Sequence, residues 1–219
     1  MEINKAFITI GLATALLQMP VAADAQHAGS ACCDHGNKTC RQNPLLQKST
    51  LPFGAPDFAR IKETDYLPAI EAAVKQQREN IQKIVDNKAK PTFANTILAY
   101  ENSGVLLENV SNVFFGLCSA HKTPVIADTE KKVTPLLTDL DNEISFNQKL
   151  FERIKYVYDH EYKSLTGEDQ RLTEVIYKGF VRSGAMLSAD KMQLMKQINS
   201  RISDLQQQWG NLLPEATNN

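Results

Sequence analysis

The sequence predicts an all-α protein built from about six amphipathic helices. Between Pro91 and His121, apolar side chains recur at steps of three, four and seven residues, which is the spacing of one buried helix face. Similar spacings recur in the other long segments, and neither a strand pattern nor an internal repeat competes with them. We therefore expect a helical framework around a shared core.

The composition is that of a globular chain. The 219 residues suit one domain or one large piece of a bigger protein, and 42% are hydrophobic against 22% charged. The formal net charge is −1, and Lys and Arg are interleaved with Glu and Asp. This pattern indicates solvated helix faces, and it argues against a basic surface for nucleic acid or anionic lipid.

The first 25 residues have the features of a cleaved signal peptide. Lys5 precedes an apolar run over residues 6–17, and Ala23 and Ala25 have the small-x-small spacing that a signal peptidase accepts. The run is shorter than the roughly 20 residues that span a bilayer, so no membrane span is expected. We expect an exported protein, located in the periplasm.

Residues 26–43 are small and polar, and we expect a flexible tether that contains cysteines. Thiolates and imidazole suit zinc or copper, but this segment has no CxxC pair, so a disulfide from Cys40 or free thiols remain alternatives to a metal site. Lipid attachment at Cys32 is another alternative, although Gly29 stands where a lipoprotein signal has a branched apolar residue. The possible metal ligands are Cys32, Cys33, His35 and Cys40.

Prolines and a glycine interrupt residues 43–61, which should therefore be irregular and lie against a surface, with Phe53 and Phe58 as anchors. The first helix is expected from Asp65, which can cap it, to Asn87. Pro68 fits its first turn, where a missing N–H costs little.

The second helix opens at Thr92, whose hydroxyl can cap it, and runs to His121. Ser103 and Gly104 interrupt its apolar face and would let another helix approach closely. The third helix covers about residues 125–144, and Pro135 inside it predicts a kink or a break.

The fourth helix is expected over residues 148–165, ended by Gly167, and the fifth over residues 168–184. The sixth begins after a cap at Ser188 and runs to about residue 213. The residues expected to face inward in these helices are Phe151, Ile154, Val157, Tyr158, Tyr162, Leu172, Val175, Ile176, Phe180, Met192, Met195, Ile198, Ile202, Leu205 and Trp209.

Possible catalytic motifs are incomplete. His160 and Glu161 begin like the HExxH zinc motif, but Ser164 occupies the place of the second histidine. Cys118 has His121 three residues further on, but its apolar surroundings favour a buried structural cysteine. The sequence offers no paired acid and base and no phosphate-binding loop, so we assign no catalytic, metal-binding or cofactor-binding residue.

Several runs of sequence are nevertheless distinctive. NPLL, LPFGAPDFARIKETDYLPAIEAAV and PTFANTILAYENSG resemble the N-terminal part of bacterial peptidyl-dipeptidases, which belong to the thimet-oligopeptidase family of zinc metallopeptidases. The stretches NQKLFERIK, GEDQRLTEVIYKGFVRSGAMLSADK and ISDLQQQWGNLL agree. The resemblance covers residues 43–219, and PTFANTI is its most specific part.

This resemblance implies that residues 44–219 form the N-terminal helical region of a larger enzyme that removes dipeptides from the C-termini of short peptides. Its zinc would be held by HExxH and a further Glu, and no position here matches them. We therefore expect this chain alone to be inactive, to bind no zinc, and to supply a channel wall that packs against a C-terminal lobe. The alternative is a free-standing, non-catalytic helical module that binds peptides or a partner protein.

Overall fold

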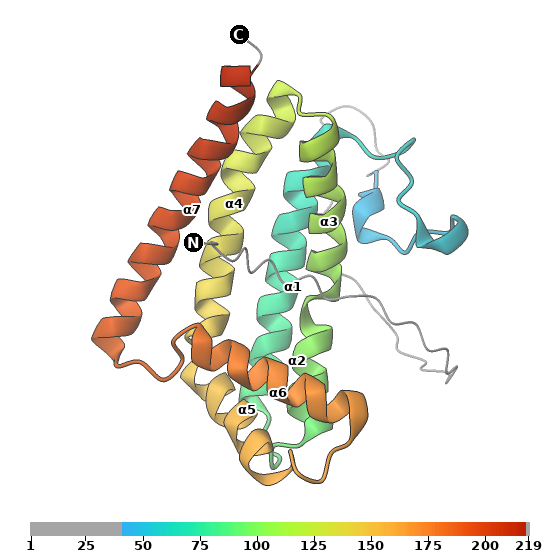
Figure 1. The fold of residues 1–219 in the computed structure, drawn as a ribbon. Coiled ribbons are helices and arrows are strands. Elements are labelled where there is room, and N and C mark those ends of the chain that lie inside the picture. The colour runs from blue at the N-terminus through green and yellow to red at the C-terminus, as the bar shows by residue number, and fades with distance from the viewer. Residues whose placement is uncertain (1–40, 218–219) are drawn as a thin grey trace.

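The computed structural model describes residues 41–217, which are helical with no strand among them (Figure 1). The expected signal peptide and residues 26–40 of the tether lie outside the described residues. The main helices are α1 (Tyr66–Asp86), α3 (Val105–Ala120), α4 (Pro124–Ser145), α5 (Gln148–His160), α6 (Gly167–Arg182) and α7 (Ala189–Thr217). This confirms the all-α class.

The core lies where α1 packs against α3, α4 and α5. The helices α1, α3 and α4 run side by side, α5 and α6 cross one end of them, and α7 lies on the outer side of α4 (Figure 1). The side chains with 0% exposure include Ile70, Ile97, Phe114, Ile126, Val133, Leu150 and Ile154. No described helix is both long enough and apolar enough to cross a bilayer.

The first helix agrees with its expected position. The α1 face carries Ile70, Val74 and Ile81 into the core, as the spacing predicts. Close approach at the small residues is also confirmed, because a Cβ added to Gly104 would lie 2.7 Å from the amide nitrogen of Gln77 on α1.

The second helix is capped as predicted but is less regular than expected. The Asn95 N–H donates to the Thr92 hydroxyl at 3.3 Å, and a π-helical turn, η4 (Phe93–Leu98), follows. A short α2 (Ala99–Glu101) and a 3-10 turn, η5 (Asn102–Gly104), then lead into α3. At η5 the Ser103 carbonyl accepts a hydrogen bond from the Asn80 amide of α1 at 3.1 Å, so the irregular turn lies where two helices touch.

Of the kink or break expected at Pro135, the break is absent, because α4 continues as one helix on both sides of the proline. Val133 and Leu140 flank the proline with exposures of 0% and 3%, so core packing on both sides holds the helix together. A proline removes only one backbone hydrogen bond and crowds one carbonyl, and tertiary packing can offset that cost.

The fourth helix is shorter than expected. It ends at His160, and Tyr162 lies beyond it in a turn. Gly167 has the positive φ of 57° that favours glycine, but it begins α6 rather than ending the preceding helix. The glycine signal was therefore correct about backbone conformation and wrong about which helix it bounds.

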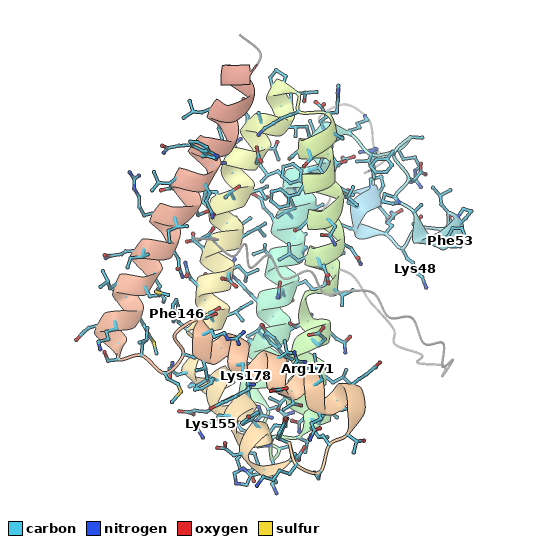
Figure 2. All side chains as sticks on the ribbon, viewed as in Figure 1. Lys48, Phe53, Phe146, Lys155, Arg171 and Lys178 are labelled. Carbon is cyan, nitrogen blue, oxygen red and sulfur yellow. The ribbon has the colours of Figure 1, made fainter. Side chains whose placement is uncertain are left out.

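Several side chains that were expected to face the core or to anchor the segment 43–61 are exposed to solvent instead. Phe58 is 60% exposed and Phe53 is fully exposed, pointing away from the bundle at the tip of its loop (Figure 2), so neither is an anchor. Leu45, Leu46 and Ile61 pack the segment onto the core in their place. The other expected inward residues that are exposed are Val175, Ile198, Ile202, Leu205 and Trp209.

Candidate functional site

The residues that begin like a zinc motif do not complete one. His160 is exposed at the end of α5, where its Nδ1 lies 2.8 Å from the Tyr156 carbonyl and its ring stacks on Tyr156 at 4.0 Å between centroids. This agrees with its interpretation as a surface helix residue. Among residues 41–217, no three His, Cys, Asp or Glu side chains are grouped so that they could hold a metal ion. The described residues therefore do not fit a zinc site.

Glu161 has a structural contact that joins distant parts of the chain. Its Oε2 accepts the backbone N–H of Phe93 at 2.8 Å, which satisfies a free donor in the first turn of η4. Glu161 is the C-terminal cap residue of α5, so this contact joins the end of α5 to the start of η4.

Cys118 is a poor nucleophile in this fold. It is half-buried on α3, and loss of solvation, with a smaller effect of Glu130, raises the pKa of its thiol to about 11. His121 lies just past the end of α3 and is exposed. Because a reactive cysteine needs a lowered pKa, the structure favours the structural role expected for Cys118.

A groove of about 750 Å³ lies between the segment 44–61 and the helices α1 and α3. Apolar side chains from both sides line it, among them Leu46 and Val110. The amides of Asn109 and Asn112 on α3 also line it, and they offer both donors and acceptors. A groove that combines apolar surface with a few amides suits an extended peptide chemically.

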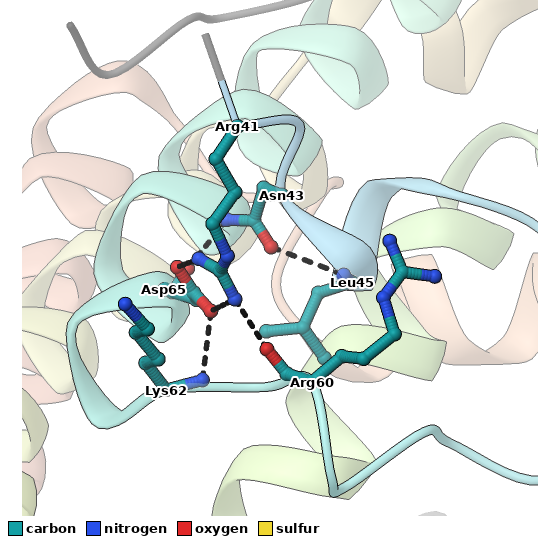
Figure 3. Close-up of polar contacts among 6 residues, drawn as sticks. All are labelled: Arg41, Asn43, Leu45, Arg60, Lys62 and Asp65. Carbon is teal, nitrogen blue, oxygen red and sulfur yellow. Dashed lines mark hydrogen bonds and ion pairs between the residues drawn. The ribbon is translucent and has the colours of Figure 1, made fainter. Parts of the chain in front are cut away.

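A polar cluster holds the segment that forms one wall of this groove (Figure 3). Arg41 donates to Asp65 through Nη1 at 2.7 Å and through Nη2 at 2.9 Å, and its Nη2 also bonds the Arg60 carbonyl. Asn43 donates to the Asp65 carbonyl at 2.8 Å and accepts from the Leu45 N–H at 3.0 Å. Arg41 and Asn43, expected in the flexible tether, are therefore held against the start of α1.

The sequence predicts that the Asp65 side chain caps α1, and this cap is absent. The Asp65 carboxylate belongs to the polar cluster instead. Its Oδ2 accepts from the Lys62 N–H at 2.7 Å, one turn before the helix. Burial by itself raises the pKa of the Asp65 carboxyl, but hydrogen bonds from Arg41 and Lys62 outweigh burial and hold the pKa below its ordinary value of 3.8.

This lowered pKa predicts a pH-dependent effect of Asp65→Asn. Because the pKa is lower in the folded state, the ionised carboxylate stabilises the fold above pH 3.8, and this stabilisation is lost as the pH falls through the folded-state pKa. We expect the variant to lose about 1 kcal/mol of unfolding free energy at pH 7, since Arg41 is partly exposed. Urea titrations of both proteins from pH 7 to pH 2 should show this difference shrinking at the acid end. A difference that stays constant with pH would contradict the assignment.

The basic residues labelled on α5 and α6 do not form a free cationic surface (Figure 2). Lys155 pairs with Asp159, while Arg171 and Lys178 both pair with Glu174. This agrees with the expectation that the interleaved charges are solvated helix faces.

Two arginines that organise the structure were missed by sequence reasoning. Arg41 joins the segment before α1 to Asp65, and Arg153 on α5 joins the turn before η4 to η4 itself. Their partners lie 24 and 58 residues away in the sequence, so no local motif marks them. The only available signal was the unusual PTFANTI run, which contains two of the Arg153 partners.

No family model matches the chain. It is 38% identical over 176 residues to a dipeptidyl carboxypeptidase of Salmonella typhimurium and 39% identical over the same length to one of Escherichia coli, which covers 80% of this chain and 26% of each relative. Oligopeptidase A of Escherichia coli is 25% identical over 176 residues. The chain thus spans about a quarter of the length of these curated relatives.

Proposed function

Because this chain belongs to the peptidyl-dipeptidase group of the thimet-oligopeptidase family, we propose that it forms helical framework of an enzyme that removes dipeptides from short peptides. The observation that carries this proposal is the similarity to two dipeptidyl carboxypeptidases over 80% of the chain. The residues that hold and cleave the peptide bond would lie outside 41–217, since the described residues do not fit a zinc site.

The groove between residues 44–61 and α3 supports a role in forming a wall along the path of the peptide. Its apolar lining can contact the side chains of an extended peptide. The Asn109 and Asn112 amides can hydrogen-bond the peptide backbone, which all peptides share. The Arg41–Asp65 pair ties the chain just before this wall to the start of α1.

The turn at Phe53 supports packing against a C-terminal lobe. Phe53 has a φ of 60°, which is unusual for a residue other than glycine, and it is fully exposed. Hydrogen bonds hold the turn, from the Gly54 N–H to the Leu51 carbonyl at 3.0 Å and from the Ser49 hydroxyl to the Ala55 carbonyl at 2.5 Å. A rigid turn that presents an aromatic ring to solvent suits insertion into another apolar surface, and we assign that surface to the lobe.

We also propose that the protein is exported. The support is the sequence of residues 1–25, with its apolar run and its Ala23-x-Ala25 spacing.

The purified chain should hydrolyse no peptide by itself, because the described residues lack a metal-ligand set. The test incubates the chain with added zinc and an N-blocked tripeptide whose cleavage releases a C-terminal dipeptide. Release of free amine is then followed, with the Escherichia coli dipeptidyl carboxypeptidase as the positive control. Release above the buffer rate that a chelator abolishes would overturn the framework proposal. Micromolar binding of the same peptide without hydrolysis would instead favour the non-catalytic peptide-binding module.

A further inference from the structure

The helix α7 packs mainly on α4, at the edge of the bundle (Figure 1), and it does so without a buried side chain. Among residues 189–210, whose side chains the structure describes, none is buried. The helices α1, α3, α4, α5 and α6 each bury apolar side chains. Because burial of apolar surface is the dominant favourable contribution to folding, the docking of α7 should contribute little to the free energy of unfolding.

The face that α7 turns toward α4 is polar. Asn199 donates to the Asn142 side chain of α4 at 2.8 Å, and the hydroxyls of Ser203 and Thr138 lie 2.9 Å apart. Two hollows of about 570 Å³ and 520 Å³ adjoin this contact, and polar side chains line most of both. Water can replace such hydrogen bonds when the helices separate, so each of them holds α7 in place only weakly.

The docked position of α7 also leaves one buried polar group unpaired. Gln207 follows Asn199 and Ser203 at four-residue steps, so it lies on the same face of the helix. Its side-chain Nε2 is buried and has no hydrogen-bond partner among the described residues. A buried donor without a partner destabilises the state that buries it, and separation of α7 from α4 would return this donor to water.

The turn before α7 is anchored to the bundle. Ala185 is 1% exposed, and its carbonyl accepts a hydrogen bond from the Gln148 side chain of α5 at 2.9 Å. Gly184 next to it has a φ of 97°, which favours glycine and fixes the direction of the turn. Residues 186–188 then belong to no helix. A fixed turn followed by a few non-helical residues lets a helix move as one body, because those residues absorb the change in backbone angles.

The side-chain contacts of α7 become fewer with distance from this turn. The Gln148 amide lies 3.7 Å from the sulfur of Met192, and the Lys196 ammonium lies 5.6 Å from the centre of the Phe146 ring. Beyond the two polar contacts with α4, residues 204–210 make no hydrogen bond or ion pair with another helix of the described chain. The contacts thus hold the near half of α7 and leave the far half without polar partners.

We propose that α7 is a hinged arm, which swings away from α4 about residues 186–188 while α1 to α6 stay folded. In the closed position the arm covers the polar face of α4 that carries Thr138 and Asn142. Asn142 is only 6% exposed in this position, so opening would make its side chain accessible to solvent. This inference does not depend on the proposed peptidase role.

Hydrogen exchange of the folded chain, measured at increasing urea concentrations below the unfolding transition, tests the arm. The α7 amides should exchange as one block, about tenfold or more faster than the core amides of α1, because a single helix is only marginally stable once it has undocked. Their exchange should also depend less on urea, since opening of the arm exposes less surface than unfolding of the whole chain. Equal protection of α7 and α1 would overturn the proposal, and so would protection that falls steadily toward residue 210, which indicates fraying.

A cross-link between the two helices distinguishes a moving arm from local opening within α7. Thr138→Cys and Ser203→Cys place two thiols where hydroxyls lie 2.9 Å apart, in a chain whose four native cysteines are replaced by alanine. Oxidation should slow exchange of the α7 amides about tenfold, and reduction should restore it. The matched control carries Ser203→Cys alone and should respond to neither treatment.

Mass spectrometry of proteolytic fragments shows whether the cross-link has formed. If it has not, Asn142→Cys with Asn199→Cys replaces the first pair, because these side chains also meet across the contact. Circular dichroism should show equal helix content in the oxidised, reduced and control proteins. Exchange of α7 that stays as fast in the cross-linked chain as in the reduced chain would overturn the proposal.

Discussion

Replacing Phe114 with alanine should lower the free energy of unfolding by about 3–5 kcal/mol. Phe114 has 0% exposure on α3, and its ring lies 5.4 Å from that of Tyr66 on α1 and 5.2 Å from that of Phe115. The change removes buried apolar surface and leaves a cavity at the contact between α1 and α3, which the helices can only partly close. Urea denaturation followed by circular dichroism measures the loss.

The matched control is the same truncation at Phe53, where the ring is fully exposed. Phe53→Ala should change the free energy of unfolding by no more than about 0.5 kcal/mol, because it removes no contact within the fold. Equal losses at the two positions, or a loss below about 1 kcal/mol for Phe114→Ala, would contradict the position of Phe114 in the core.

The helices were predictable because a buried helix face produces a regular spacing of apolar residues along the sequence. Ile70 and Val74 recur at helical spacing, and the buried face of α1 follows from that spacing alone. The cap at Thr92 was equally accessible, since donor and acceptor lie three residues apart. Features of this kind depend only on neighbours along the chain.

The residues that were predicted to be buried but are exposed share a different cause. Periodicity shows that Leu205 and Trp209 lie on one apolar face, but it does not show what covers that face. The same spacing describes the buried face of α1 and the exposed apolar residues of α7. Phe53 is an example in a loop. It lies between a proline and a glycine, and its apolar character does not show whether the ring is buried or exposed to solvent.

The polar contacts around PTFANTI depend on residues far away in the sequence. Arg153 donates through Nη1 to the Asn87 carbonyl at 2.8 Å, and through Nη2 it donates to the Asn95 side chain at 3.2 Å and the Thr96 hydroxyl at 3.4 Å. Glu161 from the same part of the chain binds the Phe93 N–H. The distinctive PTFANTI run is thus the contact point between η4 and α5, which explains its unusual composition without any catalytic role.

Arg153→Leu should therefore lower the free energy of unfolding by about 3 kcal/mol, although the position is only partly buried. The change removes the charged donors while the Asn87 carbonyl and the side chains of Asn95 and Thr96 stay in place without them. Arg153→Lys should recover only part of the loss, because a single ammonium cannot reach all of the acceptors that the planar guanidinium serves. Urea denaturation at pH 7 measures both variants.

The control for this prediction is Arg171→Leu, which makes the same change at an arginine whose side chain is 71% exposed and pairs with Glu174 on the helix surface. Such pairs contribute little in water, so its loss should stay below about 1 kcal/mol. Hydrogen exchange adds a spatial test, since Arg153→Leu should speed exchange of the η4 amides and Arg171→Leu should not. If both arginine variants lost the same stability, or if η4 kept its protection in Arg153→Leu, then backbone capping by Thr92 and Glu161 would suffice to hold the turn. Arg153 would then contribute little to the stability of η4.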